Sequence, residues 1–150
     1  MPAPAEPPRP STALANELRP ILVRLARELR KETSHLGITG GQATLLWQVA
    51  ENPGIGLRAL AELEGIATPT VSGLIDRLQR AGLVTRERSQ TDRRRIGLTI
   101  TPAGSELLVA VRARRTVWLA DRLERLQPAA RAAIAAALEP LHGLIAEREP

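Results

Sequence analysis

Residues 65–104 read GIATPTVSGLIDRLQRAGLVTRERSQTDRRRIGLTITPAG, and this stretch decides the fold. Its first part predicts a short helix with Thr68 as N-cap and Pro69 at the first helical position. Two stretches rich in Val, Ile, Leu and Thr follow at 83–88 and 95–100, and the residues between them are polar and turn-forming. The order predicts a helix followed by a β-hairpin with a charged tip.

Signals upstream of this helix complete a helix-turn-helix. Residues 58–64 predict a short helix, because their apolar side chains fall on one side and Gly65 closes it. Two short helices joined by a glycine-containing turn form a helix-turn-helix. Thr39, with a glutamine three residues later, begins a capping-box pattern and predicts a further helix. Residues 55–57 are long enough only for a stub of strand.

Long amphipathic helices are predicted on both sides of this segment. Residues 11–36 carry Leu and Ile at helical spacing, with Pro20 inside, so the helix is kinked at the proline or begins near it. Thr101 repeats the cap-plus-proline signal and predicts a long helix to about Leu126. The next helix has apolar residues spaced as in a coiled-coil seam: Ile134, Leu138, Leu141 and Ile145. We expect these faces to form the base of a two-fold dimer.

The composition excludes several classes of protein. The chain of 150 residues has a formal net charge of +5 and no cysteine, so disulfides, thiolate catalysis and cysteine-ligated zinc are excluded. No apolar run is long enough for a membrane span. Residues 1–10 contain five prolines, which favours a disordered arm over a secretory signal and predicts a cytoplasmic protein.

Nothing in the sequence supports an enzyme. Neither His35 nor His142 has a partner at metal-ligand spacing, and there is no P-loop or Rossmann glycine pattern. We therefore expect no catalytic residue, no metal and no cofactor. The two aromatic side chains, Trp47 and Trp118, are expected in the core.

The helix that follows Gly65 leaves a small, polar face once its core residues are assigned. Its candidates for DNA contact are Thr68, Pro69, Thr70, Ser72, Gly73 and Arg77. Small side chains let a helix sit deep in a groove, hydroxyls can donate to phosphates or base edges, and an arginine can reach a guanine edge. The positive end of the helix also attracts phosphate. Taken alone, this face is equally well explained as an ordinary solvated surface.

The charges at the hairpin tip favour contact with DNA over an ordinary solvated surface. Residues 86–95 contain five arginines, and the tip itself carries Asp92, Arg93 and Arg94. Neighbouring like charges repel one another, and the negative potential of a narrow minor groove would relieve that repulsion. We expect Arg94 to enter the minor groove while Asp92 holds a neighbouring guanidinium in a fixed orientation. The alternative, a surface ion pair, is worth less than about 1 kcal/mol.

An ordered set of motifs in this chain resembles the MarR family of bacterial transcriptional regulators. The resemblance is close over residues 38–104, and each motif alone would be weak evidence. The set comprises ITGGQ at 38–42, LAELEG at 60–65, TPTVSGLIDRL at 68–78, AGLVTR at 81–86, DRRR at 92–95 and LTITPAG at 98–104.

The resemblance implies a mainly α-helical (α+β) winged helix-turn-helix with a two-stranded wing. The implied parts are a disordered arm over 1–10, a dimerisation helix over 11–36, the winged helix-turn-helix over 37–101 and dimerisation helices over 102–150. A homodimer would bind a pseudo-palindromic operator in double-stranded DNA. Residues 68–77 would enter the major groove, and Arg94, oriented by Asp92, the minor groove.

Many members of the family are repressors released by small, often aromatic and anionic, molecules. This chain differs from the members that sense oxidants through cysteine, and it lacks the Tyr and Phe of an aromatic effector pocket. No effector-binding residue is assigned. A second interpretation stays open at this point: a winged-helix module whose arginine-rich tip docks an acidic protein partner.

Overall fold

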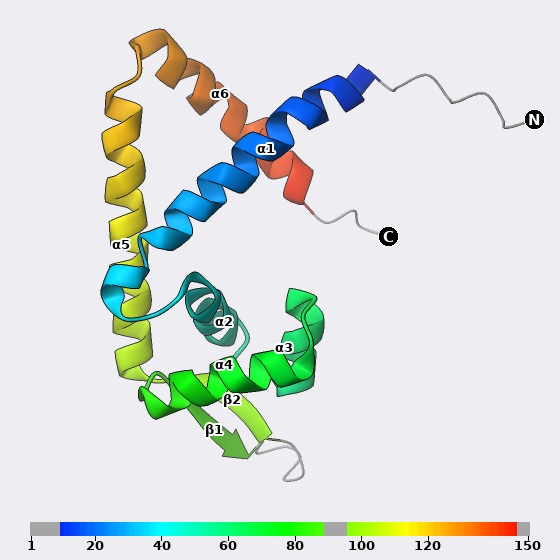
Figure 1. Cartoon of the computed structure of the whole chain (residues 1–150), viewed down its shortest axis with the longest axis vertical. Helices are drawn as coiled ribbons and strands as arrows, with labels where there is room; N and C mark the ends of the chain where they lie inside the picture. Colours follow the sequence, from blue (N-terminus) through cyan, green and yellow to red (C-terminus); the bar gives the residue numbers. More distant parts are fainter. Residues whose placement is uncertain (1–9, 89–95, 147–150) are drawn as a thin grey trace, which may run out of the picture. The chain divides into compact units, whose positions relative to one another are not determined.

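The computed structural model of the chain describes residues 10–88 and 96–146. The chain divides into two compact units, with the boundary in the sequence between Arg115 and Thr116. The elements are α1 (Pro10–Lys31), a 3₁₀ turn η1 (Ser34–Leu36), α2 (Gly40–Glu51), α3 (Leu57–Glu64), α4 (Thr68–Arg80), β1 (Val84–Arg88), β2 (Ile96–Ile100), α5 (Pro102–Glu124) and α6 (Pro128–Ile145) (Figure 1). This order confirms the predicted winged helix-turn-helix class.

The first helix differs from its prediction at the C-terminal end. It ends at Lys31 and not at Leu36, because two hydroxyls take backbone carbonyls there. Thr33 Oγ1 donates to the Arg30 carbonyl at 2.7 Å, and Ser34 Oγ donates to the Lys31 carbonyl at 2.7 Å. Such local bonds compete with continued α-helix. Of the two predicted roles for its proline, the helix start is wrong, since Pro20 lies inside α1.

The core of the first unit lies among α2, α3, α4 and the hairpin. Its fully buried side chains are Leu45, Leu46, Val49, Leu60, Val71, Ile75, Leu78, Val84 and Leu98. Burying each side chain of this kind is worth about 1.5–3 kcal/mol. The prediction of a core role is wrong for Trp47, whose side chain is 44% exposed on α2. Aliphatic side chains therefore fix α4 against its neighbours.

The wing is an antiparallel pair in which Val84 faces Ile100 and Arg88 faces Ile96. The predicted stub of strand is confirmed on the other side of β2, where Leu98 N donates to the Ile55 carbonyl at 2.8 Å. A Cβ built on Gly97 would lie 2.5 Å from the backbone oxygen of Gly54, so the strand needs glycine there. The hairpin is thereby anchored to the loop before α3.

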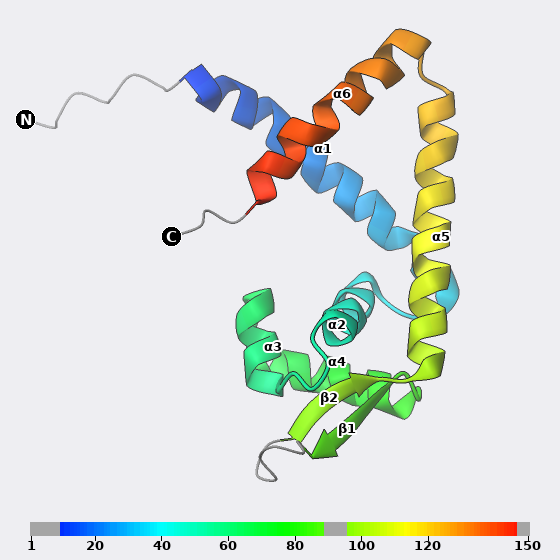
Figure 2. The same cartoon turned by 180° about the vertical axis from the view of Figure 1, so that it is seen from behind.

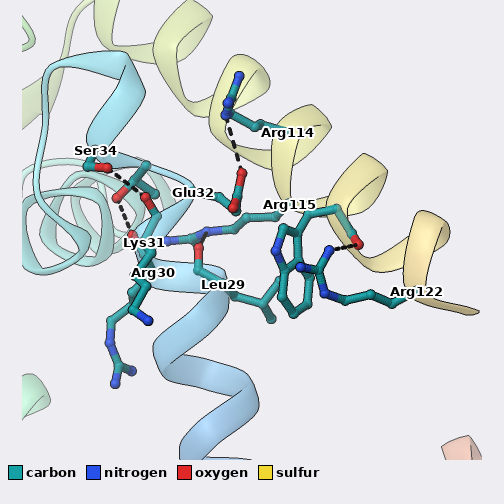
Figure 3. A network of polar contacts seen from close by, with 10 residues as sticks. Leu29, Arg30, Lys31, Glu32, Ser34, Arg114, Arg115 and Arg122 are labelled. Atoms are coloured by element: carbon teal, nitrogen blue, oxygen red, sulfur yellow. Dashed lines mark hydrogen bonds and ion pairs between the residues drawn. The ribbon is translucent and has the colours of Figure 1, made fainter.

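Two arginines on α5 join it to the end of α1 within the first unit (Figure 3). Arg115 Nε donates to the Leu29 carbonyl at 3.2 Å, and Arg114 Nε lies 3.4 Å from a carboxylate oxygen of Glu32. Burial, together with the neighbouring charge of Arg30, lowers the pKa of Arg115. The bond from Arg115 satisfies the Leu29 carbonyl, which lies in the last turn of α1, where carbonyls have no partner within the helix.

The second unit contains the end of α5 and all of α6. The predicted restart is confirmed, with Gln127 as N-cap and Pro128 at the first helical position. Half-buried Trp118 lies under the guanidinium of Arg122, 3.5 Å from the ring centre. Among the described helices, none has the length and apolar character needed to cross a bilayer.

Candidate nucleic-acid interface

Helix α4 begins one residue before its predicted start. Its N-cap is Ala67, whose carbonyl accepts hydrogen bonds from Thr70 N and Val71 N at 3.0 and 3.2 Å. Thr68 is therefore the first helical residue and Pro69 the second, and the prediction of Thr68 as N-cap is wrong. Because alanine has no side-chain acceptor, the amide groups at this helix start have no side-chain cap.

The two faces of α4 differ sharply in burial. Val71, Ile75 and Leu78 are fully buried. On the other half of the helix lie all six residues predicted from the sequence, exposed except for half-buried Ser72: Thr68, Pro69, Thr70, Ser72, Gly73 and Arg77. A Cβ built on Gly73 would meet nothing within 4 Å. The middle of this face is consequently open and flat.

The polar groups on this face are not used to hold the fold. Within residues 10–88 and 96–146, the hydroxyls of Thr68, Thr70 and Ser72 have no hydrogen-bond partner, and the guanidinium of Arg77 has neither a hydrogen bond nor an ion pair. Three hydroxyls and one cation are therefore free to bind an external ligand that carries acceptor groups.

Farther along α4 the charged residues do have partners. Asp76 Oδ1 lies 2.7 Å from Arg86 Nη2 on β1, so this ion pair joins the helix to the wing. Arg80 Nε donates to the main-chain oxygen of Asp76 at 3.3 Å. The helix and strand also pack directly against each other, and both views show the hairpin beside α4, at the end of the first unit away from α1 (Figures 1 and 2).

The tip of the wing lies outside the described residues. This applies to the predicted minor-groove residue Arg94, to its brace Asp92 and to Arg93. The described root positions the hairpin through buried Val84 and Leu98. The predicted roles of the tip residues therefore stay predictions.

Sequence reasoning missed Asp76 and Arg86 as site residues. A signal for Arg86 exists, because it follows buried Val84 by two residues and side chains alternate between the faces of a strand. Its pairing with Asp76 could not be predicted from the sequence, because the pair depends on how α4 lies across β1. In the described part of the chain, no three His, Cys, Asp or Glu residues come together as a metal site.

Comparison with known proteins agrees with this geometry. Residues 36–95 match the sequence model of the MarR family. An uncharacterised helix-turn-helix transcriptional regulator of Mycobacterium leprae is 32% identical over 113 residues, which cover 75% of this chain and 79% of that protein. A transcriptional regulator from Thermotoga maritima is similar in structure, with a TM-score of 0.73 and 30% identity over 89% of this chain and 94% of that one.

A second similar structure was solved with nucleic acid. It is a mutant of MepR from Staphylococcus aureus, bound to an oligodeoxyribonucleotide. Its TM-score is 0.65 and its identity 21%, over 88% of this chain and 97% of that one, so the likeness shows a shared fold. The fold, the motifs and the relatives agree, and the chain belongs to the MarR family of transcriptional regulators, which are not enzymes.

Proposed function

We propose that this regulator reads DNA sequence by inserting the exposed face of α4 into the major groove. The observation that carries the proposal is the set of unpartnered hydroxyls and the free Arg77 guanidinium on an otherwise flat helix face of the described chain. An arginine can bond two acceptors of guanine, and a Thr methyl can touch a thymine methyl. The positive N-terminal end of α4, where Ala67 provides no side-chain cap, suits a phosphate.

The wing adds a second contact in this proposal. Arg94 enters the minor groove next to the major-groove site, Asp92 holds it in orientation, and Arg93 adds charge at the backbone. The support is the packing of β1 against α4, which brings the root of the arginine-rich hairpin beside the proposed reading helix. In MepR, the same fold was solved on an oligodeoxyribonucleotide.

We also propose that the regulator binds as a homodimer. Apolar side chains on α1 are well exposed in the single chain, among them Leu14 at 67% and Ile21 at 61%. In the second unit, Leu138 and Ile145 on α6 are exposed as well. A second copy that covers these faces would present two α4 helices to half-sites ~34–36 Å apart, as in a pseudo-palindromic operator.

A dimer seated on an operator can exclude polymerase from a promoter, so we propose repression, relieved by a small-molecule effector. A reporter whose promoter carries the bound sequence tests the direction of control. Expression should fall when the protein is present, whereas a rise would identify an activator.

Binding to DNA itself is tested by fluorescence anisotropy with the full chain. The probes are a duplex enriched by the protein from a randomised library and a scrambled duplex, each titrated at several salt concentrations. If a dimer neutralises ~6–10 phosphates, affinity should fall by roughly 10³–10⁵ between 50 and 200 mM salt. Equal affinity for both duplexes at every salt concentration would favour the protein-interaction module.

A further inference from the structure

The ion pair between Asp76 and Arg86 is not explained by fold stability. We propose that Asp76 is a positioning residue for DNA binding, which holds the Arg86 guanidinium at the junction of α4 and β1 for contact with a backbone phosphate. This inference rests on the proposed function above, and it adds two residues to the α4 face and the wing tip.

The geometry places the pair at the edge of the proposed DNA-binding surface. Arg86 Nη2 lies 2.7 Å from Asp76 Oδ1, and the side chains are 32% and 48% exposed. On β1, Arg86 shares a face with buried Val84 and lies opposite buried Leu98, so its stem follows the inner side of the hairpin. Its guanidinium lies at the junction of α4 and β1, beside the Asp76 carboxylate.

Asp76 is an unexpected residue on a helix that approaches a polyanion. An unpaired carboxylate there would repel phosphates. Pairing with Arg86 neutralises it and leaves the other N–H groups of the guanidinium, which has five, free for a second acceptor. Arg80, bonded to the Asp76 main-chain oxygen, adds positive charge on the same side.

The exposure of the pair also argues against a mainly structural role. Ion pairs between partly solvated side chains contribute little to folding. A guanidinium already fixed in the free protein loses less conformational freedom when it meets a phosphate, so the gain appears in binding.

The main test is Asp76→Asn in the full chain, measured by anisotropy with the library-enriched duplex and with a scrambled duplex. Loss of positioning should weaken binding to the enriched duplex about tenfold and leave the melting temperature within about 2 °C. Simple charge removal from a DNA-facing surface predicts the opposite sign, with tighter binding to both duplexes. Tighter or unchanged binding to the enriched duplex would overturn the proposal.

Glu62→Gln is the matched control. Glu62 also accepts a hydrogen bond from an arginine of the same unit, with Arg58 Nε 3.1 Å from its Oε1, and its loss changes the net charge by the same amount. We expect its affinity for the enriched duplex to stay within about twofold of the parent. A tenfold loss in this variant as well would show that the effect is not specific to Asp76 and would contradict the proposal.

Combining variants tests whether the two residues act as a unit. Arg86→Gln alone should weaken binding about tenfold, and the double variant with Asp76→Asn should bind no more weakly than Arg86→Gln. Losses that multiply to about a hundredfold would show independent residues. If Asp76→Asn does not fold, Arg86→Lys replaces it, since lysine keeps the charge but lacks the planar fork. An unchanged affinity for Arg86→Lys would then overturn the proposal.

The failures of the two proposals are distinguishable. If the parent enriches no sequence from the library, the proposed function fails and this inference fails with it. If the parent enriches a sequence and Asp76→Asn binds it equally well, only the positioning role is wrong.

Discussion

The hydroxyl of Thr101 donates a hydrogen bond of 2.6 Å to the carbonyl of Gly82, which joins the start of α5 to the turn that ends α4. The same hydroxyl accepts from Gly104 N at 3.0 Å and so caps α5. Thr101 N donates to the Leu83 carbonyl at 3.0 Å. A Cβ on Gly104 would overlap the Leu83 carbonyl oxygen, so the two segments touch through backbone.

Replacing Thr101 with alanine should destabilise the first unit by about 2 kcal/mol, because the lost cap and the lost bond to Gly82 are each worth about 1 kcal/mol. Urea unfolding of the full chain measures this free energy. Thr116→Ala, on the same helix, is the control and should cost less than about 0.5 kcal/mol. Equal losses of unfolding free energy in both variants would show that the Thr101 contacts with Gly82 and Gly104 do not stabilise the unit.

Gly73→Ala should separate stability from binding. Its Cβ meets nothing within 4 Å, so the exchange should stabilise α4 by about 0.5–1 kcal/mol through its better helix propensity. The added methyl lies on the face that we propose to enter the groove, and affinity for the enriched duplex should fall. Gly41→Ala, also unobstructed and on α2, is the control and should bind as the parent does. A Gly73→Ala protein that binds as tightly as the parent would show that the face stays clear of DNA.

Arg94→Ala tests the proposed wing contact. We expect affinity for the enriched duplex to fall by about tenfold, equivalent to about 1.4 kcal/mol, with little change in the melting temperature. Arg125→Ala removes the same charge from an exposed site on the carboxyl side of α5 and should change affinity much less. Unchanged operator affinity in Arg94→Ala would remove the minor-groove role.

Ile21→Asp tests the proposed dimer. A charge in an apolar interface costs several kcal/mol unless it is paired, so sedimentation should show a shift from dimer to monomer. Ile66→Asp changes an apolar side chain that is 41% exposed in the helix-turn-helix, and it should leave the parent's oligomeric state unchanged. A monomeric parent, or an Ile21→Asp protein that remains dimeric, would contradict the α1 interface.

Elements with a local signal were predictable from the sequence. The capping box of α2 is present in both directions, with Thr39 N donating to Gln42 Oε1 at 2.8 Å and Gln42 N to Thr39 Oγ1 at 3.2 Å. Gly65 ends α3 with a φ of 65°, as expected of a left-handed cap. The hairpin strands agree with their predictions to within a residue at each described end.

Features that depend on tertiary contacts were not predictable. Helix α1 ends earlier than predicted because Thr33 is buried and its hydroxyl donates to the Arg30 carbonyl. A threonine followed by proline is compatible with N-cap or first helical position, and Thr68 takes the second in α4. The Asp76–Arg86 pair depends on how α4 crosses β1. The spacing of apolar residues along the sequence does not predict that crossing.

The central claim, that α4 reads bases, is tested most directly by parallel selection from a randomised duplex library with the parent, Arg77→Ala and Arg125→Ala. We predict that the parent and Arg125→Ala retain the same inverted repeat. Arg77→Ala should lose its preference at one base pair in each half-site, since a good bidentate contact is worth about 1–3 kcal/mol of discrimination. Recovery of identical sequences by all three proteins would contradict the claim.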